Sequence, residues 1–154
     1  MRFASQRVFD LIAGIWVGGF ITVGFLVVPM LFSALDDRQV AGMVAGRLIH
    51  TETYVSIALN LMLLILGFRL DQAQGSMSRR IRWILIAMLA CSLAAAFIFL
   101  PWMSSLKDQA TLNGVSVTET SQAVLFARLH QVSSLVYFLQ SLLGLSLVWY
   151  STKR

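Results

Sequence analysis

The chain contains four long apolar runs separated by short polar segments, and this pattern restricts its possible folds more than any other feature. The runs cover residues 11–30, 55–68, 81–100 and 132–150. Each run, with its flanking residues, supplies the ~20 residues that an α-helix needs to cross ~30 Å of hydrocarbon. The sequence therefore predicts an all-α, integral membrane four-helix bundle.

We expect one transmembrane domain, 1–154, with helices at about 5–31, 41–69, 79–101 and 120–151. Composition agrees, because 58% hydrophobic and 12% charged residues leave too little polar surface to keep such a chain in water. The single cysteine, Cys91, lies within the third run, so it forms no internal disulfide, and we interpret it as a packing residue.

The net charge of +5 is interpreted as a topology signal. The basic residues flank the apolar runs and form no amphipathic or aromatic-rich patch, so we expect a lipid bilayer and no nucleic acid as partner.

One side of the predicted spans carries eight basic residues: Arg2, Arg7, Arg69, Arg79, Arg80, Arg82, Lys153 and Arg154. The other side carries four: Arg38, Arg47, Lys107 and Arg128. The richer side is predicted to be cytoplasmic, with both termini inside, in a multi-pass protein of the bacterial inner (plasma) membrane. The cytoplasmic connection is expected to turn at Gly75 and Ser76.

Small residues four apart predict where the helices pack closely. Gly14 and Gly18 form such a pair in the first helix, and Gly42 and Gly46 form another in the second. We expect Gly18 to lie at the closest contact within the bundle, while a homo-oligomer formed through these pairs is the alternative.

Two prolines, Pro29 and Pro101, are expected to mark the outer ends of the first and third helices. Beyond these prolines the first and second halves of the chain show no internal repeat.

The candidate ligand-binding residues gather near the outer ends of the second and fourth helices. They are Arg47, His50, His130, Ser133, Ser134 and Tyr137. At 100° per residue His130, Ser134 and Tyr137 share one face, and polar groups facing lipid would be unsatisfied, so we expect this face to point into the bundle. One interpretation is an interhelical hydrogen-bond seam. A second is an outward-facing polar pocket with His130 as ligand or proton carrier and with Arg47 or Arg128 attracting an anion. A third is anchoring of the arginines to lipid headgroups.

The sequence does not identify a metal or a cofactor. His50 and His130 lie at similar predicted depth, the minimum for an axial haem pair in a membrane bundle. Against this, helical phase turns Glu52 away from the face of His50, no CxxCH motif is present, and interfacial histidines commonly reach toward the headgroups.

The usual enzyme motifs are missing from the sequence: there is no GxSxG, HExxH, Walker loop or GxGxxG. We therefore expect a protein that binds or helps to move a small solute or metal species through an outward-facing polar pocket; an enzyme acting through a bound cofactor is the alternative.

Several segments together resemble the transmembrane protein 205-like family of small four-helix membrane proteins. These segments are Ile15-Trp16-Val17-Gly18-Gly19, Val28-Pro29-Met30-Leu31-Phe32, Val44-Ala45-Gly46-Arg47-Leu48, and Phe126-Ala127-Arg128-Leu129-His130-Gln131-Val132-Ser133-Ser134. The resemblance implies a domain of undefined activity, with animal members linked to resistance to platinum drugs and no established catalytic residue. It marks Arg47, His130, Ser133 and Ser134 as typical of the family, although this chain has Ile49-His50 where an aromatic residue is expected. The alternative resemblance is to haem- or redox-linked membrane proteins of the protoporphyrinogen-oxidase or copper-resistance type.

Overall fold

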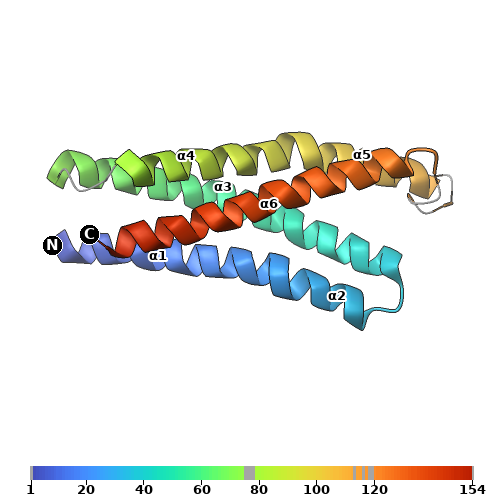
Figure 1. The fold of residues 1–154 in the computed structure, drawn as a ribbon, viewed down its shortest axis with the longest axis horizontal. Coiled ribbons are helices and arrows are strands. Elements are labelled where there is room, and N and C mark those ends of the chain that lie inside the picture. Colours follow the sequence, from blue (N-terminus) through green and yellow to red (C-terminus); the bar gives the residue numbers. More distant parts are fainter. Residues whose placement is uncertain (1, 75–78, 113, 116, 118–119, 154) are drawn as a thin grey trace.

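Four long helical stretches make up a computed structural model that describes residues 2–74, 79–112, 114–115, 117 and 120–153 (Figure 1). The elements are α1 (Arg2–Thr22), η1 (Val23–Val27), α2 (Val28–Ala34), α3 (Arg38–Gln74), α4 (Arg79–Ala94), η2 (Ala95–Phe99), α5 (Leu100–Leu112) and α6 (Ala123–Thr152). The described residues are all-helical in their regular structure and contain no strand. The predicted turn at Gly75 and Ser76 lies outside the described residues.

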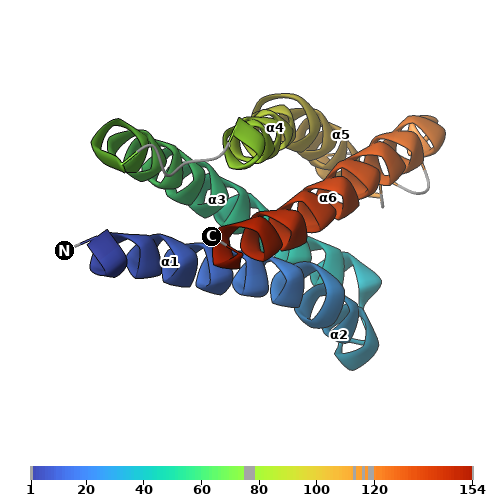
Figure 2. The same cartoon turned by 60° about the vertical axis from the view of Figure 1, so that its left-hand side comes forward.

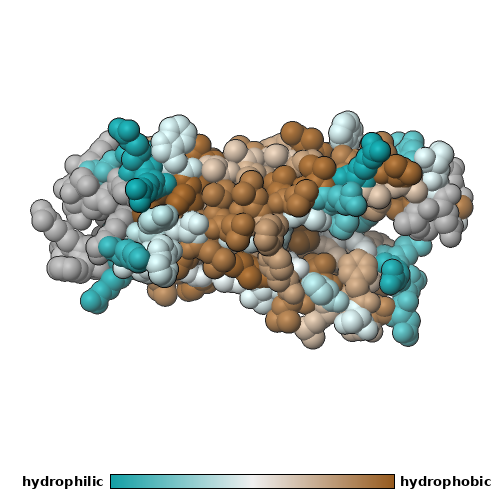
Figure 3. All heavy atoms as spheres, in the orientation of Figure 1, coloured by the Kyte–Doolittle hydropathy of each residue, from teal (hydrophilic) through white to brown (hydrophobic). Residues whose placement is uncertain are grey.

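Each stretch is long and apolar enough to span a membrane. The four candidate spans are Gln6–Ala34, Arg38–Arg69, Arg79–Leu112 and Ala123–Thr152. Hydrophobic side chains dominate the middle of the surface shown in Figure 3, and hydrophilic ones gather toward both ends. This distribution is the one expected of a multi-pass membrane protein, because lipid solvates the middle and water the ends.

Both termini lie at one end of the bundle, which we call the terminal end; the connections α2–α3 and α5–α6 lie at the other, the distal end (Figures 1 and 2). The apolar core fills the terminal half, where Phe9, Leu63, Ile81, Leu85 and Leu147 are almost completely buried. Toward the distal end the hairpin of α2 and α3 diverges from that of α5 and α6 (Figure 1). Four polar residues, Ser56, Asn60, Ser92 and Gln140, are buried in the middle parts of their helices.

Neither proline ends its helix, which corrects the sequence prediction. The first stretch continues past Pro29 to Ala34, and the third continues past Pro101 to Leu112. Proline lacks an N–H and its ring displaces the carbonyl four residues earlier. In both stretches a π-helical segment ends two residues before the proline and absorbs this misfit, with bonds from Val28 N–H to the Val23 carbonyl and from Leu100 N–H to the Ala95 carbonyl.

The prediction that Gly18 lies at the closest helix contact is wrong. A Cβ added at Gly14 or Gly18 would meet nothing within 4 Å, so both glycines border open space. Close contacts occur at two other glycines. A Cβ on Gly144 would lie 3.0 Å from a methyl group of Val17, and one on Gly24 would strike the ring of Tyr137. Contact across helices, and not four-residue spacing, decides which glycine cannot be replaced.

Candidate functional site

A chain of hydrogen bonds joins the first and second helical stretches near the middle of the bundle. The Trp16 indole Nε1 donates to Ser56 Oγ at 2.9 Å, and Ser56 Oγ donates to Glu52 Oε1 at 2.6 Å. Trp16 is 4% exposed and Ser56 is fully buried. Because Ser56 accepts one bond and donates its only proton, the indole fixes the direction in which the hydroxyl points, which is toward the carboxylate.

Two polar groups on the same helix face lack a partner. Glu52 Oε2 is buried and accepts no hydrogen bond, and both amide atoms of Asn60 are buried without partners. Glu52, Ser56 and Asn60 are spaced four residues apart, so they form one stripe along α3. Buried polar atoms in proteins are nearly always satisfied, and their exceptions commonly mark a ligand, water or ion site. We call Trp16, Glu52, Ser56, Asn60 and Tyr137 the Glu52 centre.

Glu52 lies deep in its span. It is about 21 Å along the helix from Arg38 and about 25 Å from Arg69, the two ends of the second candidate span. An ionisable side chain at such a depth is costly, and in membrane bundles it marks an ion, proton or substrate pathway by default.

Tyr137 brings α6 into the centre. Its hydroxyl donates to the Phe20 carbonyl at 2.6 Å and also interacts with the backbone N–H of Gly24. These two backbone groups are four residues apart and would normally bond to each other within an α-helix. The hydroxyl therefore interacts with both groups just before the π-helical segment that starts at Val23. The ring stacks on Phe20 at a centroid distance of 4.1 Å and lies close enough to Glu52 to interact electrostatically.

Lys107 connects the two diverging hairpins nearer the distal end. Its Nζ donates to the Gly42 carbonyl of α3 at 3.3 Å and lies 5.7 Å from the centroid of the Phe126 ring on α6. The half-buried ammonium group of Lys107 therefore lies on the distal side of Glu52 along α3.

The structure places His130 on the exposed surface, so the prediction that it faces the bundle interior is wrong. Its ring stacks near Phe126 of the same helix, with centroids 6.4 Å apart. The hydroxyls of Ser133 and Ser134 donate to the His130 carbonyl at 2.9 and 2.8 Å. A serine hydroxyl that donates to a carbonyl of its own helix needs no hydrogen-bond partner on another helix. This face of α6 can therefore point away from the bundle. Of the predicted stripe, Tyr137 points between the helices.

Arg47 and His50 are also exposed, on α3. The His50 ring tilts against Tyr54 of its own helix at 4.9 Å between centroids. In the part of the chain that the structure describes, no hydrogen bond or ion pair joins Arg47, His50 and His130. Nor do the described residues contain any group of three or more His, Cys, Asp or Glu side chains that could hold a metal ion. The geometry offers no support for a haem held between the two histidines.

The sequence interpretation did not single out Glu52, Ser56 and Asn60 as a site, for a physical reason. The apolar run of the second helix starts only at residue 55, so Glu52, although inside the helix expected at about 41–69, was placed near the membrane boundary. The candidate span runs from Arg38 to Arg69, so Glu52 falls near its middle. The four-residue spacing of three polar residues on one face was the signal that could have found the centre.

Comparison with known protein families gives a match over more than half of the chain. The model of a family described as "Domain of unknown function (DUF4149)" matches residues 11–111, which is more than half of the chain. The chain belongs to this family. No curated protein and no solved structure matches it. The DUF4149 match contains Trp16, Glu52, Ser56 and Asn60, whereas α6 with Tyr137 and His130 lies beyond it.

Proposed function

We propose that this DUF4149 protein binds a small monovalent cation within the membrane and helps to move it, with the carboxylate of Glu52 as the binding group. One observation carries the proposal: Glu52 Oε2 is buried midway along the bundle without a partner. A carboxylate in such surroundings needs a proton or a cation, because an uncompensated charge in a low-dielectric interior is strongly unfavourable. Glu52 Oε1 is already held by Ser56, so the second oxygen is the group available for binding.

The surroundings favour a monovalent cation over a divalent metal ion. Calcium takes six to eight oxygen ligands and magnesium requires an octahedron, whereas Glu52, Ser56 and Asn60 offer few oxygens. Trp16 donates to the serine that holds the carboxylate, and Tyr137 interacts electrostatically with Glu52; aromatic rings attract cations, ammonium groups in particular. This proposal replaces the outward-facing pocket at His130 as the place where a solute binds.

Access is proposed from the distal end, the side of Glu52 on which Lys107 lies against α3. Lys107 lies about two turns of helix from Glu52, since a Cβ on Gly46 would be 3.5 Å from its Nζ and Gly46 precedes Glu52 by six residues. Its charge opposes the passage of cations. We expect the Lys107→Gln variant to bind the same cation with a higher association rate, because the substitution removes a positive charge that repels the incoming cation.

The test uses the purified protein in a weakly buffered detergent solution with a pH-sensitive dye. Sodium, potassium and tetramethylammonium chlorides are the probes. At a pH where the Glu52 carboxyl is protonated, a binding cation displaces the proton, so the wild type should release about one proton per chain. Glu52→Gln, which keeps an acceptor for Ser56, should release none. Asp108→Asn is the matched control, because Asp108 is an exposed carboxylate on α5. Equal release by Glu52→Gln and the wild type, or no release with any probe, would refute the proposal.

The cellular membrane, the orientation of the chain and its wider family are also proposals. We propose that the protein is a single transmembrane domain of the bacterial inner membrane with both termini cytoplasmic, supported by the eight-to-four distribution of basic residues. The relationship to the transmembrane protein 205-like family is likewise proposed, on the motifs around Trp16, Pro29, Arg47 and His130.

A further inference from the structure

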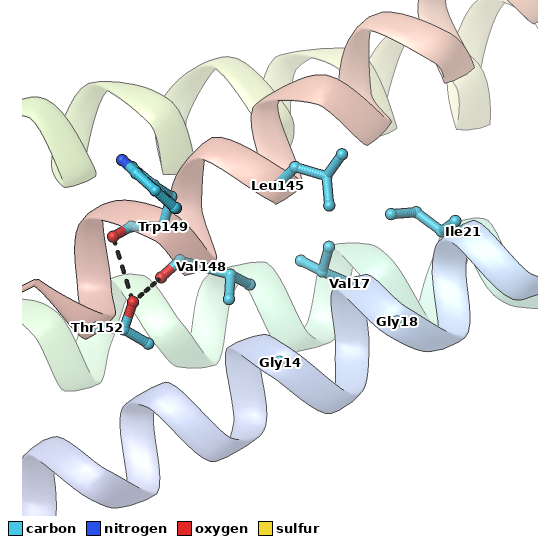
Figure 4. A pocket seen from close by; sticks show the side chains of 8 residues that line it. All are labelled: Gly14, Val17, Gly18, Ile21, Leu145, Val148, Trp149 and Thr152. Carbon is cyan, nitrogen blue, oxygen red and sulfur yellow. Dashed lines mark hydrogen bonds between the residues drawn. The ribbon is translucent and has the colours of Figure 1, made fainter.

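An apolar groove of about 420 Å³ runs between α1 and α6 near the terminal end (Figure 4). It is lined by Gly14, Val17, Gly18, Ile21, Leu145, Val148, Trp149 and Thr152. From Gly14 to Ile21 it follows about 10 Å of α1. The groove lies away from the Glu52 centre, so an inference about it does not depend on the proposed function.

The inner surface of the groove suits an apolar occupant. Gly14 and Gly18 form part of it and leave open space where side chains would be. Its one side-chain hydroxyl, on Thr152, already donates to backbone carbonyls of its own helix, Val148 at 3.0 Å and Trp149 at 3.3 Å (Figure 4). The hydroxyl in the lining is therefore already satisfied, and the indole N–H of Trp149 belongs to a side chain that is 59% exposed, so a hydrocarbon chain suits most of the surface.

Basic groups border the groove at the terminal end. Arg7 is exposed and lies seven residues before Gly14, about two turns away on the same helix face. The Lys153 ammonium lies 3.9 Å from the centroid of the Trp149 ring, at the other wall. Asp10 is also on this side of α1, where the Gln6 amide donates to it at 3.4 Å, so the two basic groups are accompanied by a carboxylate.

These charges distinguish between two occupants. A second copy of the chain, docked by a two-fold axis parallel to the helices, would bring Arg7 and Lys153 of both copies together, and like charges across an interface are unfavourable. A phospholipid with an anionic headgroup has the complementary charge, and basic pockets between membrane helices commonly bind such headgroups. We propose that the groove holds one acyl chain of an anionic phospholipid whose phosphate lies against Arg7 and Lys153.

The experiment counts lipids bound to delipidated protein by native mass spectrometry in detergent, with phosphatidylglycerol and phosphatidylcholine as probes. The wild type should retain one phosphatidylglycerol, bound about thirty-fold more tightly than phosphatidylcholine, the effect expected of two basic residues. Gly18→Leu fills the groove and should abolish retention. Gly19→Leu is the matched control, because Gly19 is equally open but does not line the groove.

A second set of variants tests whether Arg7 and Lys153 bind the lipid headgroup. The double variant Arg7→Gln, Lys153→Gln should retain both lipids equally, whereas Arg79→Gln, an exposed arginine on α4, should keep the preference. Equal retention of phosphatidylglycerol by Gly18→Leu and Gly19→Leu would overturn the proposal. So would a dimer that Gly18→Leu dissociates, since a second copy would then fill the groove, or a wild type without preference between the two lipids.

Discussion

Replacing Gly24 by alanine tests the packing of Tyr137 against the first helix. The added Cβ would strike Cε1 of Tyr137 and lie 2.7 Å from both Cζ and the hydroxyl oxygen, so the ring must move. Overpacking of this kind costs about 1–3 kcal/mol. Movement of the ring also loses its bond to the Phe20 carbonyl, about 0.6 kcal/mol in membrane proteins, and its stacking on Phe20, about 0.5–1.5 kcal/mol. Alanine regains about 1 kcal/mol of helix propensity.

The net expectation is a loss of about 1–4 kcal/mol in the free energy of unfolding. Unfolding by sodium dodecyl sulfate in detergent micelles, followed by circular dichroism, measures it. Gly19→Ala is the control and should be neutral or slightly stabilising, because its Cβ meets open space. In a Tyr137→Ala background Gly24→Ala should cost nothing further, since the obstructing ring is gone. Equal stability of Gly24→Ala and Gly19→Ala would refute the described packing of α6 on η1.

Three further outcomes are expected. Ser92→Ala should destabilise the fold by about 1–3 kcal/mol, because it leaves the buried Gln140 amide without its 2.9 Å partner, and adding Gln140→Leu should restore much of the loss in the same unfolding assay. Topology reporters fused after Gln74 should report the cytoplasm and those after Gly114 the exterior; the opposite result would reverse the orientation inferred from basic residues. Cysteine at His130 should react readily with thiol reagents and His130→Leu should leave the unfolding curve unchanged, whereas a protected or strongly destabilised variant would show that this position is interior.

The sequence predicted the all-helical class and the four candidate spans because long apolar runs have few alternatives. It failed where a property depends on a partner helix. His130 was expected to face the bundle because the polar side chains on its helix face need hydrogen-bond partners. Ser134, however, finds its acceptor one turn away on the same helix. The closest contacts were assigned to Gly18 by spacing, whereas Gly24 and Gly144 approach side chains of other helices. Glu52 was placed at the membrane boundary because the apolar run of its helix begins only at residue 55, whereas the candidate span begins at Arg38.

The structure reveals an equivalence between the two halves that the residue types conceal. Pro101 follows Pro29 by 72 residues, and the π-helical segments η1 and η2 precede these prolines at the same distance. The same offset relates four pairs of buried residues, which are Phe9 and Ile81, Ala13 and Leu85, Trp16 and Met88, and Phe20 and Ser92. Burial pattern and backbone distortion thus repeat although few side chains do.

This equivalence explains how α6 organises the bundle and why the Glu52 centre lies in one half. Tyr137 and Gln140, three residues apart on α6, reach equivalent positions of the two halves: the Phe20 carbonyl and the Ser92 hydroxyl. Both contacts fall one turn before a π-helical segment, so α6 joins the two halves at the same level. The halves differ at Trp16, whose counterpart Met88 has no N–H to orient a serine. The shared backbone supplies the scaffold, and the indole at position 16 directs a hydroxyl toward Glu52 in the first half.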